Sequence, residues 1–359
     1  MKKLKVGHIG WLDNDNEEYC ETVAWCDINA DRMKKVAETH PQITMYTDYR
    51  EMLKHSGLDL VIIATPNWVH AEQAIAFLKA GKHVFLEKPM GISKEESDSI
   101  LCAAKASGKR LGIDFELRYS TFARCMKRFI DSSDYGELRR IEFVHHRGSW
   151  LEEGNGIWRT QPEKSGGMYF MEPIHEVDIF RFFGGEIKSA QTIVGPNVLP
   201  QYKFQDNMCS HFFFESGASA TILTSHTHSA ELSDPEMATY NTGHHMTMIL
   251  TFTGGSVEIN FITCTILFNR FEEYPVGSGG IKVVFDRIED YSPRGMDAFA
   301  HDINGMRKDF IRRVACNEAS LESAMDAWKS HQVCIAAEIS AASDFRQVKV
   351  DYTLPDEMR

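Results

Sequence analysis

The sequence predicts an α/β Rossmann-type domain with a doubly wound parallel sheet, followed by an α+β domain with a large open, mostly antiparallel sheet. In residues 1–115, short apolar segments alternate with amphipathic segments of about 10 to 15 residues, as in consecutive βαβ units. Beyond residue 120 the strand-like segments are longer and follow one another directly, which is typical of an antiparallel sheet with one free face. We therefore expect two domains, over residues 1–120 and 121–359.

The elements of the first domain follow from apolar segments and the signals that flank them. Residues 58–64 are apolar almost throughout, as expected of a parallel strand covered on both faces. Ser93 and Glu96 form a capping box that opens a helix, and Gly81 and Gly108 are helix C-terminal signals. Strands are thus expected at residues 4–10, 22–27, 58–64, 83–86 and 109–115, and helices at 31–39, 68–79 and 93–108.

The second domain is expected to be a sheet with helices before and after it. A helix at 121–132 precedes strands at 138–146, 190–194, 209–214, 218–226, 246–253, 256–261 and 281–285, and helices at 297–316 and 320–342 close the chain. The glycine-rich segment 277–280 is interpreted as a hairpin loop and not as a phosphate cradle, because no helix follows it.

Composition and charge narrow the classes of partner. The formal net charge of −12 argues against nucleic acid or an anionic membrane surface. No segment approaches the roughly 18 apolar residues of a membrane span, and the N-terminus turns polar too soon for a signal peptide. The eight cysteines include no Cys-x-x-Cys pair, so neither a zinc site nor a redox dithiol is indicated. We expect a cytoplasmic protein.

Lys88 is the first candidate for chemistry, because it directly follows the apolar strand at residues 83–86. Open α/β sheets place their ligands at the carboxyl ends of their strands, and partial burial there lowers a lysine pKa towards the range useful for proton transfer. The alternative for Lys88 alone is a solvated loop cation. A second cluster, Gly166-Gly167 followed by His175 and Asp178, could supply a histidine that completes an acid/base pair.

Several motifs, in order along nearly the whole chain, together resemble the Gfo/Idh/MocA oxidoreductases, the family of glucose–fructose oxidoreductase and inositol dehydrogenase. The motifs are Ala64-Thr65-Pro66-Asn67 with His70, Gly81-Lys82-His83-Val84 leading into Glu87-Lys88-Pro89, Phe115-Glu116-Leu117-Arg118, Trp158-Arg159, and Gly166-Gly167 through His175-Glu176-Val177-Asp178 to Gly184-Gly185-Glu186. Their combination is specific, because a chance match of all of them in this order is improbable.

The resemblance implies a dinucleotide-binding first domain that takes NAD rather than NADP, and a second domain that binds a sugar, a cyclic polyol or a derivative. Lys88 would hold the reacting hydroxyl and take part in proton transfer, and His175 would act as acid/base on its opposite side. Cofactor contacts would come from Gly10, Asp27, Thr65, Pro66, Asn67, His70, Glu87, Lys88 and Arg118, and substrate contacts from Lys88, Trp158, Arg159, Tyr169 and His175. Asp27, at the end of the second strand, would bind the adenosine ribose, which favours NAD. The open sheet would form a homodimer or homotetramer.

Some of these residues have simpler interpretations. Asn67 could be a turn residue after Pro66, and His70 a surface histidine in the first turn of a helix. Asp27 could begin a turn with Asn29, and Asp178 could cap or orient its helix.

The second cluster departs from the family pattern at one position. The family normally places an aspartate four residues before the histidine, where this chain has Met171, with Glu172 beside it. One residue turns a helical side chain by about 100°, so Glu172 is a catalytic candidate only if the chain is irregular before Pro173. The alternative is a surface glutamate beside a core methionine. Tyr169 offers a further candidate hydroxyl.

The loop after the first strand departs further. Family members usually carry Gly-x-Gly-x-x-Gly before a helix whose N-terminus binds the pyrophosphate, whereas no second or third glycine follows Gly10 in this position. Acidic side chains crowd the loop instead, at Asp13, Asp15, Glu17, Glu18 and Glu21. Either the loop has been remodelled, with weakened or lost cofactor binding, or a glycine-rich segment is missing from this sequence. Because the rest of the cofactor wall is retained, we expect NAD to bind.

Fifteen histidines include His226 and His228, which would share one face of a strand at a spacing that can bind zinc or manganese. Asp234 and Glu236 lie nearby in sequence. We expect a polar sheet face or a subunit contact here, and no metal, because the family site needs none.

The leading hypothesis is an NAD-dependent oxidoreductase that transfers hydride between nicotinamide and a ring carbon of a sugar, cyclitol or glycoside. A second hypothesis is a redox-neutral lyase or glycoside-cleaving enzyme that recycles bound NAD, motivated by Met171. A third is a non-catalytic sugar-sensing protein with a degenerate cofactor loop.

Overall fold

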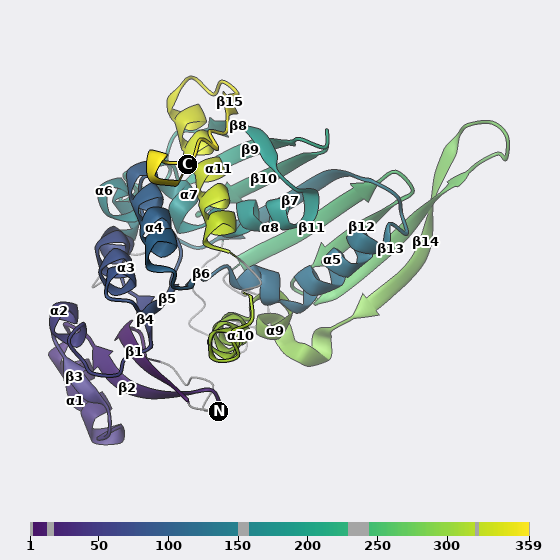
Figure 1. The fold of residues 1–359 in the computed structure, drawn as a ribbon. Coiled ribbons are helices and arrows are strands. Elements are labelled where there is room, and N and C mark those ends of the chain that lie inside the picture. The colour runs from purple at the N-terminus through teal and green to yellow at the C-terminus, as the bar shows by residue number, and fades with distance from the viewer. Residues whose placement is uncertain (1–2, 13–17, 150–157, 229–243, 320–322, 359) are drawn as a thin grey trace.

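The computed structural model describes residues 3–12, 18–149, 158–228, 244–319 and 323–358, and it contains two large sheets (Figure 1). The first sheet is parallel, with strand order β3-β2-β1-β4-β5-β6. Its elements are β1 (Leu4–Gly10), β2 (Cys20–Cys26), α1 (Ala30–Thr39), β3 (Thr44–Tyr46), α2 (Tyr49–Met52), β4 (Leu60–Ala64), the 3-10 helix η1 (Asn67–Val69), α3 (His70–Lys79), β5 (His83–Leu86), α4 (Lys94–Ser107), β6 (Leu111–Ile113) and the 3-10 helix η2 (Glu116–Tyr119). The predicted Rossmann-type class is confirmed.

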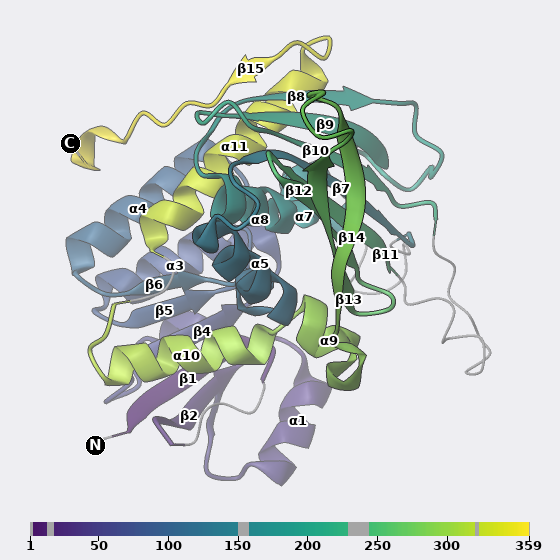
Figure 2. The same ribbon diagram turned by 90° about the vertical axis from the view of Figure 1, so that its right-hand side faces the viewer.

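Both faces of the central strands are buried, which explains why β4 is apolar at successive positions. On one face, Val61 belongs to the main core, which includes buried side chains of α3 and α4. On the other face, Leu60 belongs to a second cluster with Phe310 of α10 (Ile303–Ala315). Figure 2 shows α10 lying across this face, although it comes from near the end of the chain. The expected domain of residues 121–359 therefore also supplies part of the first domain's packing.

The connection from β1 to β2 differs from a full Rossmann unit. The two strands pair in parallel, yet residues 11–12 and 18–19, which are described, contain no helix. Gly10 ends β1 with φ +86°, a conformation that favours glycine. A cavity of 810 Å³ lies beside β2 and α1, with Trp11, Trp25 and Arg32 among its lining. Of the acidic loop residues, Asp13, Asp15 and Glu17 lie outside the described part, and Glu18 and Glu21 are exposed.

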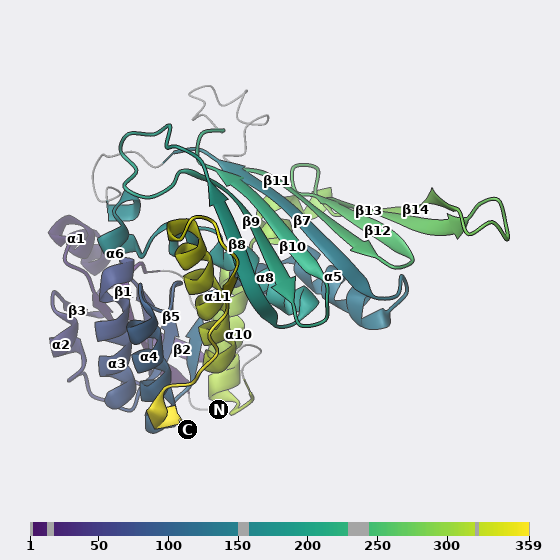
Figure 3. The ribbon, with the colours of Figure 1, turned by 90° about the horizontal axis from the view of Figure 1, so that it is seen from above.

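The second sheet has nine strands in the order β14-β13-β12-β11-β7-β10-β9-β8-β15 and is antiparallel except between β7 and β10. Its elements are α5 (Thr121–Ser132), β7 (Leu138–Arg147), α6 (Pro162–Ser165), α7 (Met168–Met171), α8 (Ile174–Gly184), β8 (Ile187–Val194), β9 (Asn207–Phe214), β10 (Ser219–Ser225), β11 (His244–Phe252), β12 (Gly255–Asn260), β13 (Thr265–Glu273), β14 (Ile281–Asp290), η5 (Ser292–Arg294), α9 (Gly295–Ala300), α11 (Ala324–Ala342), β15 (Val348–Lys349) and η6 (Asp356–Met358). Figure 3 shows α5, α8 and α11 on one side of this sheet. The expected open, mostly antiparallel sheet is confirmed.

The structure differs from the prediction at strand β13 and at the helix expected at 297–316. Strand β13 was not predicted, and with β14 it forms a hairpin that projects from the body (Figure 1). The helix expected at 297–316 is two helices, because the chain breaks at His301 and Asp302 caps α10 by accepting the backbone N–H of Gly305 at 2.9 Å. Within the described residues, no helix is long and apolar enough to cross a bilayer.

Candidate active site

Lys88 lies just beyond the carboxyl end of β5, where the parallel sheet presents its ligand-binding edge. Its side chain is half-buried, and its ammonium donates to the backbone carbonyl of Met171 at the end of α7. Burial lowers the pKa of Lys88, while the carboxylates of Glu87, Glu116 and Glu176 oppose that change. The alternative of a solvated loop cation is therefore wrong, and the lysine is held at the junction of the two domains.

His175 reaches the same place from the first turn of α8. The side chain is buried, and burial lowers its pKa to about 4, so that the ring is neutral at neutral pH. The Glu116 carboxylate raises the pKa of His175, whereas the positive charge of Lys88 lowers it. The structure thus brings together the two predicted residues, as a buried neutral imidazole beside a lysine.

Glu116, a residue to which the sequence assigned no role, joins Lys88 and His175. It follows β6 in η2 and is 7% exposed. Its Oε2 lies 3.8 Å from Nδ1 of His175, and its Oε1 lies 3.1 Å from Nδ1 of His301. Burial alone would raise the pKa of this carboxyl, but His175, His301 and Lys88 lower it to about 2. Glu116 is therefore an anion between two histidines.

Glu87 and Asp114 form a second carboxyl pair next to Lys88. Burial, together with Glu116, raises the pKa of Glu87 to about 7, against the lowering effect of Lys88. Burial and the neighbouring Glu87 raise the pKa of Asp114 well above its usual range. A pair of close, buried carboxyls retains a proton that isolated groups would lose. Among the described residues, Oδ1 of Asp114 has no hydrogen-bond partner, so it is a buried acceptor that a bound group could satisfy.

Neither residue at the unusual position 171–172 is a free base. The sulfur of Met171 accepts from the Asn67 amide at 3.4 Å, within a buried contact between the two domains. The carboxylate of Glu172 forms an ion pair with Arg147 of β7. Because that charge is neutralised, the structure gives Glu172 an ion-pairing role and does not support the catalytic role expected of it.

The residues after β4 form hydrogen bonds with the segment after β5 and with the second domain. His70 is fully buried, and its two ring nitrogens lie 2.9 Å from the carbonyl oxygen of Pro89 and 2.8 Å from that of Thr65. The interpretation as a surface histidine is therefore wrong. Asn67 donates its amide to the carbonyl of Ser165 at 2.8 Å, so it links the two domains. Pro66 is the residue before η1, and the contact of these residues with a cofactor stays a prediction.

At the other end of the edge, Asp27 follows β2 and is mostly buried. It accepts the backbone N–H of Asn29 at 2.8 Å, which is the turn proposed as its simpler role, and it pairs with Arg32 at 2.8 Å. Arg32 also donates to the carbonyl of Gly10 at 3.0 Å. A carboxylate, a cation and a tight glycine turn at the end of the first two strands fit the adenosine end of a dinucleotide.

The residues at the two ends of the site therefore fit a bound dinucleotide, whereas the part that would bind its pyrophosphate differs from related folds. The buried acceptor of Asp114 and the lysine are present at the nicotinamide end, and Asp27 with Arg32 at the adenosine end. The helix N-terminus that binds pyrophosphate in related folds has no counterpart among the described residues between β1 and β2.

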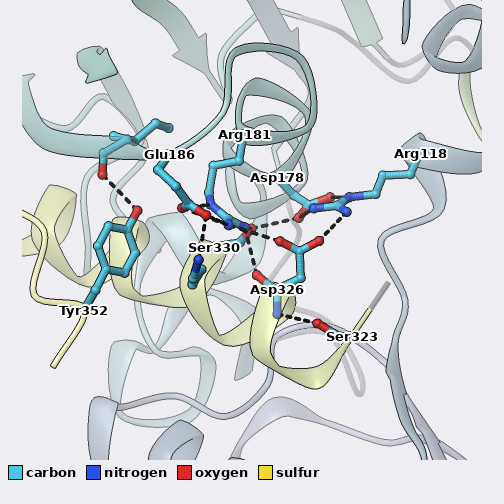
Figure 4. Close-up of polar contacts among 10 residues, drawn as sticks. Arg118, Asp178, Arg181, Glu186, Ser323, Asp326, Ser330 and Tyr352 are labelled. Carbon is cyan, nitrogen blue, oxygen red and sulfur yellow. Dashed lines mark hydrogen bonds and ion pairs between the residues drawn. The ribbon is translucent and has the colours of Figure 1, made fainter. Parts of the chain in front are cut away.

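Arg118 does not face the cofactor as expected. Its guanidinium forms two bonds with the Asp178 carboxylate, at 2.5 and 2.6 Å, and a third with Asp326 at 2.7 Å (Figure 4). Ser330 donates to Asp178 at 2.7 Å, and Arg181 binds Asp326 at 3.1 Å. This buried network joins η2 to α8 and α11, so Arg118 and Asp178 hold the domains together, as the orienting role of Asp178 suggested.

Tyr169 is also directed away from the expected site. It is 1% exposed, and its hydroxyl contacts the hydroxyls of Thr192 at 2.9 Å and of Ser210 within the second sheet's core. The expectation of a substrate-binding hydroxyl is therefore corrected, because this group is already satisfied. Its backbone N–H donates to Glu338 of α11 at 2.9 Å.

Trp158 and Arg159 lie near the first domain. The ring of Trp158 meets that of Trp68 edge to face, with 5.3 Å between centroids, and the Arg159 guanidinium lies 5.0 Å from the Trp158 ring centroid. Burial lowers the pKa of Arg159. Their contact with substrate stays a prediction.

The expected histidine pair is split. Strand β10 ends at Ser225, and His226 is buried against the hydroxyl of Tyr202 at 2.8 Å, whereas His228 is exposed beside His146 and His245. Within the described part of the chain, no group of three or more histidine, cysteine or acidic side chains could hold a metal ion. Asp234 and Glu236 lie outside that part.

Comparison with protein families matches residues 6–115 to a model described as an oxidoreductase family with an NAD-binding Rossmann fold, and residues 123–258 to the GFO/IDH/MocA C-terminal domain. A scyllo-inositol 2-dehydrogenase (NAD(+)) of Bacillus subtilis is 27% identical over 301 residues, 81% of this chain and 77% of that protein. An inositol 2-dehydrogenase of Salmonella typhimurium is 30% identical over 169 residues, 46% of this chain and 47% of that protein. The matches cover less than two thirds of several curated relatives.

Solved structures give the same fold over nearly the whole chain. A levoglucosan dehydrogenase in complex with NADH and levoglucosan superimposes with a TM-score of 0.78, covering 97% of this chain and 100% of that one at 19% identity. At this identity, the likeness shows the shared two-domain architecture.

Proposed function

Because the chain belongs to the Gfo/Idh/MocA oxidoreductase family, we propose that it is an NAD-dependent dehydrogenase that transfers hydride between nicotinamide and a ring carbon of a sugar, cyclitol or glycoside. One observation carries the proposal: the half-buried Lys88 and the buried, neutral His175 lie close enough to interact electrostatically at the carboxyl edge of the parallel sheet. The relatives named as inositol dehydrogenases support it and do not favour the redox-neutral or non-catalytic alternatives.

The protein residues supply the proton chemistry. Nicotinamide, when bound, accepts or donates the hydride. The ammonium of Lys88 can donate a hydrogen bond to a substrate oxygen and stabilise negative charge on it. His175, neutral because of its burial, can take the hydroxyl proton during oxidation and return it during reduction.

The residues that would hold NAD lie at the two ends of the edge. Asp27 would bind the adenosine ribose, and Gly10 would allow close approach of the backbone. Thr65, Pro66 and Glu87 would line the nicotinamide end. Because the described residues 11–12 and 18–19 contain no helix, they would give the pyrophosphate less stabilisation than the helix N-terminus of a full Rossmann unit, so we expect weaker binding of NAD rather than its loss.

We also propose a homodimer or homotetramer formed through the open sheet. Strand β14 lies at the edge of the sheet and exposes apolar side chains, with Val283 and Phe285 64% and 63% exposed. An exposed apolar edge strand on a projecting hairpin is unusual in a monomer. Sedimentation velocity of the wild type, compared with a Val283→Lys/Phe285→Lys variant, tests the proposal, because only the variant should sediment as a monomer.

The catalytic proposal is tested by substituting Lys88. Wild type, Lys88→Met and the control Lys79→Met, whose side chain is exposed, would be assayed for NADH formation at 340 nm with myo-inositol, scyllo-inositol and levoglucosan. We expect the Lys88 variant to lose turnover by about 10³-fold or more while its folding, followed by circular dichroism, and its NAD binding stay largely intact. Wild-type turnover in Lys88→Met would overturn the assignment.

A further inference from the structure

We propose that Glu116 and His301 form a relay that carries the proton of His175 between the buried site and solvent. The inference rests on the proposed dehydrogenase function, because it explains where the substrate proton goes. The side chain of His175 is only 11% exposed, so the surrounding protein limits direct transfer of its proton to solvent, and a path through neighbouring side chains would help the proton to leave.

The geometry supplies such a path. The Glu116 carboxylate lies between two imidazoles, with Oε1 3.1 Å from Nδ1 of His301 and Oε2 3.8 Å from Nδ1 of His175. Nδ1 of His175 is buried and has no hydrogen-bond partner among the described residues. The exposed fraction of the side chain rises from 11% for His175 and 10% for Glu116 to 33% for His301. The three groups thus lead from the interior to the surface.

The surrounding charges keep the middle group ionised. Lys88 lies on one side of Glu116, and both histidines lower the pKa of its carboxyl. The pKa values of the nearby carboxyls of Glu87 and Asp114 are raised, so this pair holds a proton more readily than Glu116 does. Glu116 is therefore the carboxyl of the three that is ionised most readily. Glu116 can therefore accept a proton transiently, which a carboxyl that was already protonated could not do.

The relay also supplies a carboxylate that the site lacks at position 171, where the family usually has an aspartate and this chain has Met171. Met171 cannot act as an acid or a base, and the carboxylate of its neighbour Glu172 is paired with Arg147. Glu116 comes from the first domain, and its carboxylate interacts with both Lys88 and His175. It therefore supplies, from a different segment, a carboxylate beside the acid/base pair.

Oxidation of a substrate would move one proton through the three residues. The substrate O–H breaks and its proton passes to Nε2 of neutral His175. NAD, when bound, would take the hydride of the neighbouring C–H bond, so that the substrate becomes a carbonyl. The imidazolium then loses its Nδ1 proton to Glu116. Glu116 passes a proton to Nδ1 of His301, and the Nε2 proton of His301 leaves to water. One proton has then reached solvent and each residue has its starting charge, but His175 ends with its proton on Nε2 and His301 with its proton on Nδ1. A flip of each ring restores the starting tautomers before the next turnover.

The first test measures the coupling without any substrate. Histidine titrations would be followed by NMR of ¹³C/¹⁵N-histidine-labelled protein, in the wild type, in Glu116→Gln and in the control Glu215→Gln, which removes an exposed carboxylate. Removing an anion within about 4–6 Å lowers a histidine pKa by about one unit or more. We expect both His175 and His301 to shift downwards in Glu116→Gln only. Unchanged titrations of either histidine would overturn the relay.

The second test measures the proton transfer itself. His301→Asn leaves the buried residues in place and should lower kcat about tenfold or more, with little change in KM, on whichever of myo-inositol, scyllo-inositol and levoglucosan the wild type oxidises. Because His301 is partly exposed, added imidazole should restore the turnover of this variant and not that of Lys88→Met. Wild-type turnover in His301→Asn, or a loss that imidazole does not restore, would overturn the relay. If the wild type oxidises none of the three, the proposed function fails, and the titrations still decide whether Glu116 couples the histidines.

Discussion

Replacing Arg118 by methionine should destabilise the protein through the partner that it leaves behind. The guanidinium is 5% exposed and the Asp178 carboxylate is fully buried, and two bonds of 2.5 and 2.6 Å join them (Figure 4). In Arg118→Met, the Asp178 carboxylate would keep the hydroxyl of Ser330, at 2.7 Å, but lose its cationic partner. The third bond, to Asp326 in α11, would be lost as well.

The magnitude follows from burial. Removing one member of a buried ion pair costs about 3–5 kcal/mol, because an uncompensated charge remains in a poorly solvated place. At about 2 °C per kcal/mol, the lower end of the range for large domains, the Tm should fall by about 6–10 °C. The double variant Arg118→Met/Asp178→Asn removes that charge and should recover about half of the loss or more.

Calorimetry at neutral pH provides the measurement, and Lys54→Met provides the control, because its ion pair with Glu51 has both side chains more than half exposed. The control should leave the Tm within about one degree of the wild type. The reasoning is refuted if Arg118→Met has the same Tm as the control variant, or if the double variant has no higher Tm than Arg118→Met alone.

Three further outcomes are expected. Burial raises the pKa of Glu338 to about 7, so the native state binds the proton of this carboxyl more tightly than the unfolded state does. The free energy of unfolding therefore falls as the pH rises from the unfolded pKa of 4.5 to the native pKa of about 7. Relative to the wild type, Glu338→Gln should gain about 2–3 kcal/mol between pH 5 and pH 8 in urea unfolding. Tyr169→Phe, which removes the buried hydroxyl that Thr192 and Ser210 contact, should lose about 1–3 kcal/mol of stability while kinetic assays find KM unchanged. Asp27→Asn should weaken NAD more than NADP, as calorimetric titration with each would show; equal weakening would contradict a ribose-binding role.

Local pattern predicted most of the fold. The helix opened by Ser93 and closed at Gly108 is present with both caps, because these signals act within a few residues. Strand β13 was missed, and it lies towards an exposed edge of the second sheet, where the alternation between buried and exposed residues weakens in its second half. The break at His301 was also missed, although the capping residue Asp302 was a signal that could have revealed it.

The site was predicted only where its residues lie in local motifs. Lys88 and His175 follow a strand and begin a helix, so sequence context indicates their positions. Glu116 and His301 are separated by 185 positions and meet because α9 and α10 return to the first domain. No sequence pattern connects them, since their contact depends on how the two sheets pack. For the same reason, the partners of Arg118 and Tyr169 could not be inferred from their motifs.

The covering of the first sheet by α10 has a consequence for how the protein is made. Strand β6 ends at residue 113 and α10 begins at residue 303, so a ribosome must add 190 residues before this face can close. At about 5–20 residues per second, the apolar side chains of Val6, Leu60 and Phe85 wait on the order of 10 to 40 seconds for their partners. During that time the newly made first domain exposes apolar surface of the kind that chaperones bind, and a fragment that ends at residue 120 would keep that face open permanently.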